Sequence, residues 1–148
     1  MKRFIICIII TLVGSVAELF AQYQVNCIDT NGETMTFRVV GYGKNAKKAS
    51  TNAELSVIRA IMFEGIPNTQ HSIPMISETE SAVFDKHGNA LNRFYGGEYK
   101  NEILSSVIVR NFGKDANKLK SITLDITVNT RALRNKLEKI GIIRKFGL

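Results

Sequence analysis

The side chains that most often carry chemistry are few in this chain and lie far apart. Its 148 residues include two histidines, His71 and His87, and two cysteines. Three carboxylates near the histidines could be combined with them as metal ligands: Glu78, Glu80 and Asp85. The ligand spacing of a zinc site is absent, and no third group is evident that would orient a Cys27–histidine pair for nucleophilic catalysis. We therefore predict no catalytic residues, no metal site and no bound cofactor.

The pair Gly41-x-Gly43 resembles the beginning of a nucleotide-binding glycine loop. The third glycine of that motif is missing, and no parallel strand–helix–strand unit follows. We interpret the two glycines as allowing either a tight strand-to-helix turn or a close approach of a helix to a sheet.

Positive charge is the main compositional feature. Lys and Arg number 20 against 13 Asp and Glu, which gives a formal charge of +7. Nucleic acid is not an expected partner, because aromatic residues make up only 8% of the chain and no nucleic-acid-binding motif is present. A solvated surface is the first interpretation of the charge, and contact with an anionic envelope polymer is the second. The candidate anion contacts are Lys44, Lys47, Lys48, Arg131 and Arg134.

Residues 1–21 have the layout of a secretory signal peptide. Two basic residues precede the apolar run FIICIIITLV, and Ala21 is the small residue at the expected cleavage point. The run is too short for a spanning helix, which needs roughly 20 apolar residues, and an uncleaved anchor is the alternative. Cleavage would leave residues 22–148, with charge +6, no transmembrane span and Cys27 as the one thiol. The LFAQ ending favours a bacterial protein exported to the periplasm or outer envelope.

A β-hairpin is predicted at the start of the mature chain. Residues 24–28 and 35–41 are β-rich runs, and Asn31-Gly32 between them is typical of a two-residue hairpin turn. With these two residues at the tip, Ile28 pairs with Met35, and both lie on the core face. Cys27 then lies on the other face, as a small half-buried side chain.

A long helix is expected over residues 45–64, with Asn45 as its N-cap and Gly65 after its end. Its apolar stripe is rich in alanine, which lets a helix lie close to a sheet. Residues 66–102 are broken by two prolines and several glycines, and only short helices near 77–85 and after Tyr99 are expected there.

Two more strands and a helix complete the chain. Residues 103–112 and 121–128 form a predicted hairpin, and the second run alternates apolar and polar residues like a half-buried antiparallel strand. A helix capped by Asn129 or Thr130 then extends to about Ile140. The predicted fold is a single α+β domain, with an antiparallel sheet of about four strands on which the alanine-rich helix and the C-terminal helix pack.

The stretch VVGYGKNAKKASTNAELSVIRAIMFEG, from Val39 to Gly65, resembles an exported domain found in small bacterial lipoproteins and in the N-terminal part of the flagellar assembly protein T. The shared pattern is a strand, Gly-x-Gly and an alanine-punctuated helix. The resemblance implies a strand–helix–strand–strand arrangement with the helix on an antiparallel sheet. It also implies a role in envelope assembly rather than catalysis, so it carries over no catalytic residues. This chain departs from the pattern in having no lipobox and a longer middle segment.

From these observations we expect a non-enzymatic envelope protein that acts by protein–protein contact, with a separate partner or with itself. Binding of an anionic envelope glycan or lipid is the alternative. The candidate contact surfaces are residues 66–102 and the C-terminal tail, whose contact residues are Ile142, Ile143, Arg144, Lys145 and Phe146.

Overall fold

Four strands form one antiparallel sheet in the computed structural model, which describes residues 25–145. The strands are β1 (Val25–Asn31), β2 (Thr34–Tyr42), β3 (Ile103–Lys114) and β4 (Lys120–Asn129), and the order in the sheet is β1-β2-β4-β3. The helices are α1 (Ala46–Arg59), a π-helical turn η1 (Ala60–Glu64), α2 (Glu80–Gly96), a 3-10 turn η2 (Glu98–Glu102) and α3 (Thr130–Lys139). The predicted α+β class is confirmed. The predicted signal peptide lies outside the described residues.

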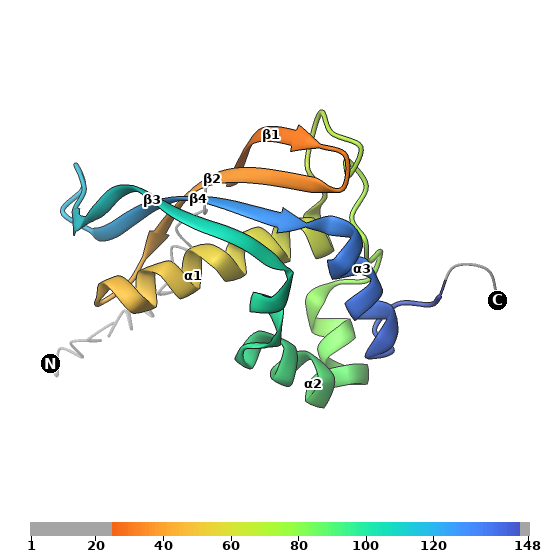
Figure 1. The fold of residues 1–148 in the computed structure, drawn as a ribbon. Helices are drawn as coiled ribbons and strands as arrows, with labels where there is room; N and C mark the ends of the chain where they lie inside the picture. The colour runs from red at the N-terminus through yellow and green to blue at the C-terminus, as the bar shows by residue number, and fades with distance from the viewer. Residues whose placement is uncertain (1–24, 146–148) are drawn as a thin grey trace, which may run out of the picture.

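The core lies between the sheet and α1, which crosses beneath it (Figure 1). Alternate residues of the two central strands point toward α1 and are buried: Met35, Phe37, Val39, Ile122, Leu124, Ile126 and Val128. The opposite face of these strands carries polar side chains, including the Arg38–Asp125 ion pair at 2.8 Å. This period-two pattern is that of a sheet with one covered face, as the sequence of β4 predicts.

The close packing of α1 on β2 depends on two glycines. A Cβ at Gly41 would lie 2.2 Å from the Ala49 carbonyl oxygen, and one at Gly43 would lie 2.5 Å from the Ala49 nitrogen. The helix backbone therefore occupies the space that side chains would take. Of the two interpretations given for Gly41 and Gly43, the structure shows the close approach of the helix to the sheet. Asn45 caps the helix as predicted, because its side chain accepts a hydrogen bond of 2.8 Å from the Lys48 nitrogen.

The register of the β1–β2 hairpin differs from the prediction. Asn31 pairs with Thr34, so the turn residues are Gly32 and Glu33, and only Gly32 has a positive φ, of 58°. A β-bulge at Ile28 then shifts the rest of β1, and Cys27 pairs with Phe37. The predicted faces were wrong for both bulge residues, since Ile28 is 47% exposed and Cys27 is half-buried against the core. The added residue reverses the alternation of β1, which the sequence pattern does not reveal.

Residues 66–102 are more regular than predicted. Nearly half of this stretch is α2, which follows the N-cap Thr79 and has one non-helical residue, His87. The sequence His87-Gly88-Asn89 predicts a turn that would end a helix. The structure instead has a kink there within a helix that continues. Val83, Leu91 and Phe94 anchor α2 in the core.

The C-terminal tail turns back onto the core after α3. Ile142 is buried and Ile143 is half-buried against the core cluster. Their nitrogens both donate to the Leu137 carbonyl oxygen. Within residues 25–145, no helix is both long and apolar enough to cross a membrane.

Candidate functional site

The largest group of exposed apolar side chains lies on β3, one of the two edge strands. Leu104 and Val107 are each 57% exposed, Ile108 is 55% exposed and Val109 is 47% exposed. We call these four residues the β3 patch. Single exposed apolar residues are ordinary on protein surfaces, but four within six positions of one edge strand indicate a contact surface. The sequence predicts β3 as a strand without indicating that it lies at the edge.

The backbone of β3 is open on the side away from β4. The strand pairs only with β4 among the described strands, and register shifts flank the regular segment Ser105–Ile108. Near the loop end, the Arg110 guanidinium donates to the Lys114 carbonyl oxygen at 3.0 Å. The outward N–H and C=O groups around Ser105–Ile108 can therefore accept another strand.

The loop end of the β3 patch is basic, whereas Val107 lies opposite Asp125, which is paired with Arg38. The sequence from Ile103 to Lys114 contains Arg110 and Lys114 but no acidic residue. The following loop adds Lys118, while its Asp115 carboxylate accepts hydrogen bonds from two loop nitrogens, those of Asn117 and Leu119. β3 is therefore an apolar edge strand with positive charge at one end.

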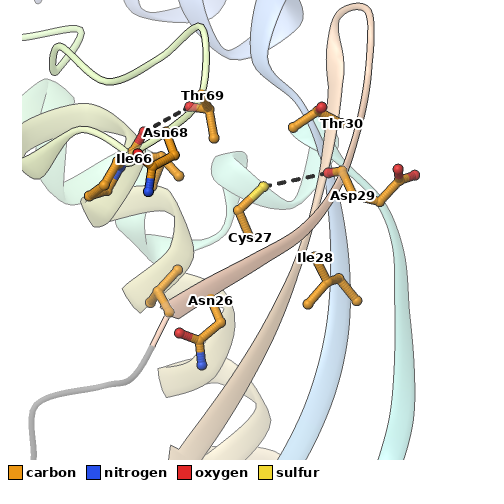
Figure 2. Close-up of a pocket in the computed structure, with 10 residues that line it drawn as sticks. Asn26, Cys27, Ile28, Asp29, Thr30, Ile66, Asn68 and Thr69 are labelled. Atoms are coloured by element: carbon orange, nitrogen blue, oxygen red, sulfur yellow. Dashed lines mark hydrogen bonds between the residues drawn. The ribbon is translucent and has the colours of Figure 1, made fainter.

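The other edge, β1, faces a groove of about 550 Å³ opposite the loop 66–69. Cys27 lies on the side of β1 that faces the loop and Ile28 on the opposite side (Figure 2), and both residues line the groove. The Cys27 thiol lies 3.5 Å from the Asp29 carbonyl oxygen, and burial raises the pKa of the thiol. The loop holds its own shape through a hydrogen bond of 2.8 Å from Thr69 Oγ1 to the Ile66 carbonyl oxygen. A folded loop thus flanks β1, unlike β3.

A second cavity, of about 470 Å³, lies between the β1–β2 turn, the loop before α2 and the start of α3. We call it the α3 cleft. Its charged and titratable lining residues are Glu33, His71, Arg131 and Arg134. Arg131 forms an ion pair with Glu33, and Arg134 lies 3.8 Å from Glu138 on the same helix. Burial and the charge of Arg134 lower the pKa of His71, so its imidazole is neutral at pH 7.

The structure separates the predicted anion contacts into two groups. Lys44, Lys47 and Lys48 are exposed around the beginning of α1. Arg131 and Arg134 line the α3 cleft, which lies beyond the other end of α1 (Figure 1). The five residues therefore form no single basic surface. The sequence identifies the two arginines among the candidate anion contacts, but it gives no sign that the fold brings His71 and Glu33 beside them.

In the described part of the predicted tail contact, only the charged residues are exposed. Ile142 belongs to the core and Ile143 is packed against it, so neither forms an exposed apolar surface. Arg144 and Lys145 are exposed, and Phe146 lies outside the described residues. Within 66–102, the exposed apolar residues are Ile73 in the loop and Phe84 in α2.

Two of the three carboxylates considered as metal ligands have other partners. Glu78 is paired with Lys86, and Glu80 with Arg59 at 3.0 Å. No group of three or more His, Cys, Asp or Glu side chains within residues 25–145 is arranged to hold a metal ion.

Comparison with known proteins adds no family to this description. No family model matches the chain, and no curated protein or solved structure is significantly similar to it.

Proposed function

We propose that this chain is a non-enzymatic, exported protein of the bacterial envelope, and that it holds a partner protein through the edge of β3. The observation that carries the proposal is the β3 patch, four apolar side chains each about half exposed along an otherwise open strand edge. Export and envelope location rest on the signal-like residues 1–21 and on the resemblance of residues 39–65 to exported assembly domains.

The mode of contact is addition of a strand to the sheet. A partner segment in extended conformation would hydrogen-bond to the outward backbone groups of Ser105–Ile108. Its side chains would cover Val107 on one face of the sheet and Ile108 on the other, because neighbouring strand residues point to opposite faces. The register shifts on either side limit the docking segment to a few residues, which favours one defined partner over open-ended stacking.

The partner segment is apolar and acidic. The neighbourhood of the β3 patch contains Arg110, Lys114 and Lys118, so acidic side chains at one end of the added strand would meet opposite charge. A second copy of this chain would instead bring two basic edges together. Charge therefore favours a different protein over self-association.

A peptide-binding experiment tests this proposal. The probe is a fluorescent peptide of about eight residues, a usual strand length, in which valines are followed by glutamates gathered at one end. Controls are the same peptide with lysine in place of glutamate, and one with N-methylated central amides that cannot pair. We expect the purified protein to bind the acidic peptide and neither control.

Matched variants on the two edges locate the binding. Val107→Lys places a charge on the β3 patch and should weaken binding at least about tenfold. Thr30→Lys places the same charge on the exposed surface of β1 and should leave binding unchanged. Equal weakening by both variants, or binding of the N-methylated peptide, would contradict strand addition at β3. Self-association that Val107→Lys abolishes, without peptide binding, would replace the separate partner with a second copy.

A further inference from the structure

The loop end of the β3–β4 hairpin and the beginning of α1 together carry a dense group of cations. The two segments lie at the same end of the molecule (Figure 1), and the Gly43 nitrogen, just before α1, donates to the Lys120 carbonyl oxygen at 3.2 Å. Across the hairpin, Lys114 pairs directly with Lys120. We call the exposed lysines of this region the basic end: Lys44, Lys47, Lys48, Lys114, Lys118 and Lys120.

The charge of the basic end is not neutralised by ion pairs. The salt bridges among residues 25–145 lie elsewhere and include none of the six lysines. Asp115 is the one acidic residue in the sequence ranges 44–53 and 110–124, and its carboxylate accepts hydrogen bonds from the Asn117 and Leu119 nitrogens of its own loop. Six positive charges therefore face one negative charge.

The lysines at the beginning of α1 do not stabilise the helix. Lys47 and Lys48 belong to its first turn, which contains no acidic residue. The helix dipole places partial positive charge at this end, so acidic side chains are favoured there and cations are disfavoured. Helix stability therefore does not explain these lysines, whereas contact with an anionic partner does.

An exposed leucine lies at the tip of the hairpin between two of the lysines. Leu119 is 49% exposed, and Lys118 and Lys120 are its neighbours in the chain. Hydrogen bonds hold the loop in one shape, since the Asp115 nitrogen donates to the Leu119 carbonyl oxygen at 2.8 Å and the Lys118 nitrogen donates to the Asp115 carbonyl oxygen at 3.0 Å. The leucine is thus held at the surface before any partner arrives.

We propose that the basic end is a contact surface for a membrane that contains anionic phospholipid. The lysine ammonium groups pair with lipid phosphates, and Leu119 enters the boundary between headgroups and acyl chains. Lysines around an apolar tip fit this partner better than a soluble polyanion, which has no apolar layer to receive the leucine. The contact is peripheral and reversible, and it does not depend on the β3 patch.

Vesicle binding tests the proposal. The protein is mixed with vesicles of phosphatidylcholine alone or with about one third phosphatidylglycerol, and the bound fraction is measured by sedimentation. We expect the anionic vesicles to bind at least about tenfold more tightly than the neutral ones. The difference should shrink as salt increases. All variants keep the same N-terminus, so residues 1–24 contribute equally in each.

Two triple exchanges assign the charge contribution to one end of the molecule. Glutamine at all three lysines of the basic end that lie around the beginning of α1 should weaken binding to anionic vesicles at least about tenfold. The matched control places glutamine at Lys139, Arg144 and Lys145, which are exposed at the end of α3 and beyond it. It removes the same charge and should change binding less than about twofold.

The apolar contribution has its own pair of variants. Leu119→Ser should weaken vesicle binding about fivefold, whereas Ile73→Ser, at an even more exposed residue in the loop before α2, should have no effect. A polarity-sensitive fluorophore locates the contact in a chain whose two cysteines are replaced by serine. Attached at Asn117→Cys, it should shift to shorter wavelength with anionic vesicles. Attached at Thr30→Cys, near the β1–β2 turn, it should not.

Several results would overturn the proposal: equal binding to neutral and anionic vesicles, equal losses from the two triple exchanges, or equal shifts at positions 117 and 30. Polygalacturonate, an acidic polysaccharide, is the competing ligand. If it binds as tightly as the vesicles and Leu119→Ser has no effect, the basic end is a site for a soluble polyanion instead. Val107→Lys should not weaken vesicle binding, and the triple exchange around α1 should leave binding of the strand peptide intact. Failure at the basic end is therefore distinguishable from failure at β3.

Discussion

The two edge strands of the sheet differ in how far their unpaired backbone groups are protected from pairing with another strand. β1 is mostly polar, contains a bulge at Ile28 and is flanked by the loop 66–69 across a groove. β3 is longer, carries the four exposed apolar residues of the β3 patch and has no flanking segment among the described residues. Proteins usually protect an edge strand with charge, bulges or a covering segment. The difference is that β1 is protected, whereas the edge of β3 is left open among the described residues.

β3 is protected on either side of its central segment but not within that segment. Its register shifts lie on both sides of Ser105–Ile108, and Arg110 closes the strand toward the loop by bonding the Lys114 carbonyl oxygen. These features would stop uncontrolled pairing along the whole strand while leaving a short segment open. We therefore regard the β3 edge as a limited binding site instead of an unprotected strand.

The largest effect is expected from a substitution that disturbs both edge strands together. Gly41→Ala forces a Cβ against the Ala49 carbonyl oxygen and the Ala53 Cβ, so α1 must move off β2. We expect a loss of roughly 3 kcal/mol in the free energy of unfolding, measured by urea denaturation. Hydrogen exchange should accelerate in β1 and β3 alike. A change of less than about 0.5 kcal/mol would contradict the close contact between helix and sheet on which both edges depend.

Reversing charge beside the β3 patch should change which peptide binds. Arg110→Glu should weaken binding of the acidic strand peptide about fivefold to tenfold and allow the lysine-containing peptide to bind. Both effects should shrink as salt increases, because the charges are exposed. Lys139→Glu, on α3, is the matched charge control and should have little effect. Unchanged preference in Arg110→Glu would show that apolar contact alone determines the partner.

Thiol reactivity compares the exposure of the two edges directly. In a chain with Cys7 replaced by serine, Cys27 reports on β1, and a second variant with Cys27→Ser and Ser106→Cys reports on β3. Burial raises the pKa of Cys27, so at pH 8 it should react with iodoacetamide about tenfold more slowly than the thiol at position 106. Similar rates would mean that the loop 66–69 does not shield β1.

The smallest expected effect lies between the edges, at the bidentate Arg38–Asp125 pair joining β2 to β4. The hydrogen bonds from Arg38 lower the pKa of Asp125, so the pair stabilises the fold above the unfolded pKa of the carboxyl and loses this contribution as pH falls. Arg38→Ala should therefore slightly lower the melting temperature at pH 7. The difference from the unsubstituted protein should diminish below about pH 4. A constant difference from pH 7 to pH 2 would assign the loss to packing instead of charge.

The central elements of the fold follow directly from the sequence. Alternation in β4 predicts its buried face, Asn45 and Gly65 predict the ends of the long helix, and Gly41 with Gly43 predicts its closeness to the sheet. These signals are local, since each depends on a repeat or on the conformational needs of one residue. The bulge at Ile28 left no such signal, because it depends on how β1 packs against β2 and the core.

The candidate sites were predicted less completely because they depend on sheet order and on long-range contacts. Val107, Ile108 and Val109 form a continuous apolar run, which a strand buried on both faces would also have. Only the position of β3 at the edge leaves that run exposed. The basic residues at 131 and 134 were identified, but Glu33 and His71 reach them through contacts across about 100 and 60 residues of sequence.

Amide hydrogen exchange along the two edge strands tests the central claim most directly. The protein is measured alone and with a saturating amount of the acidic strand peptide. We predict that alternate, outward-facing amides between Leu104 and Val109 slow at least about tenfold, while those of Val25–Asn31 keep their rates. Unchanged exchange in β3, or equal slowing in β1, would contradict the assignment of the β3 edge as the partner-binding site.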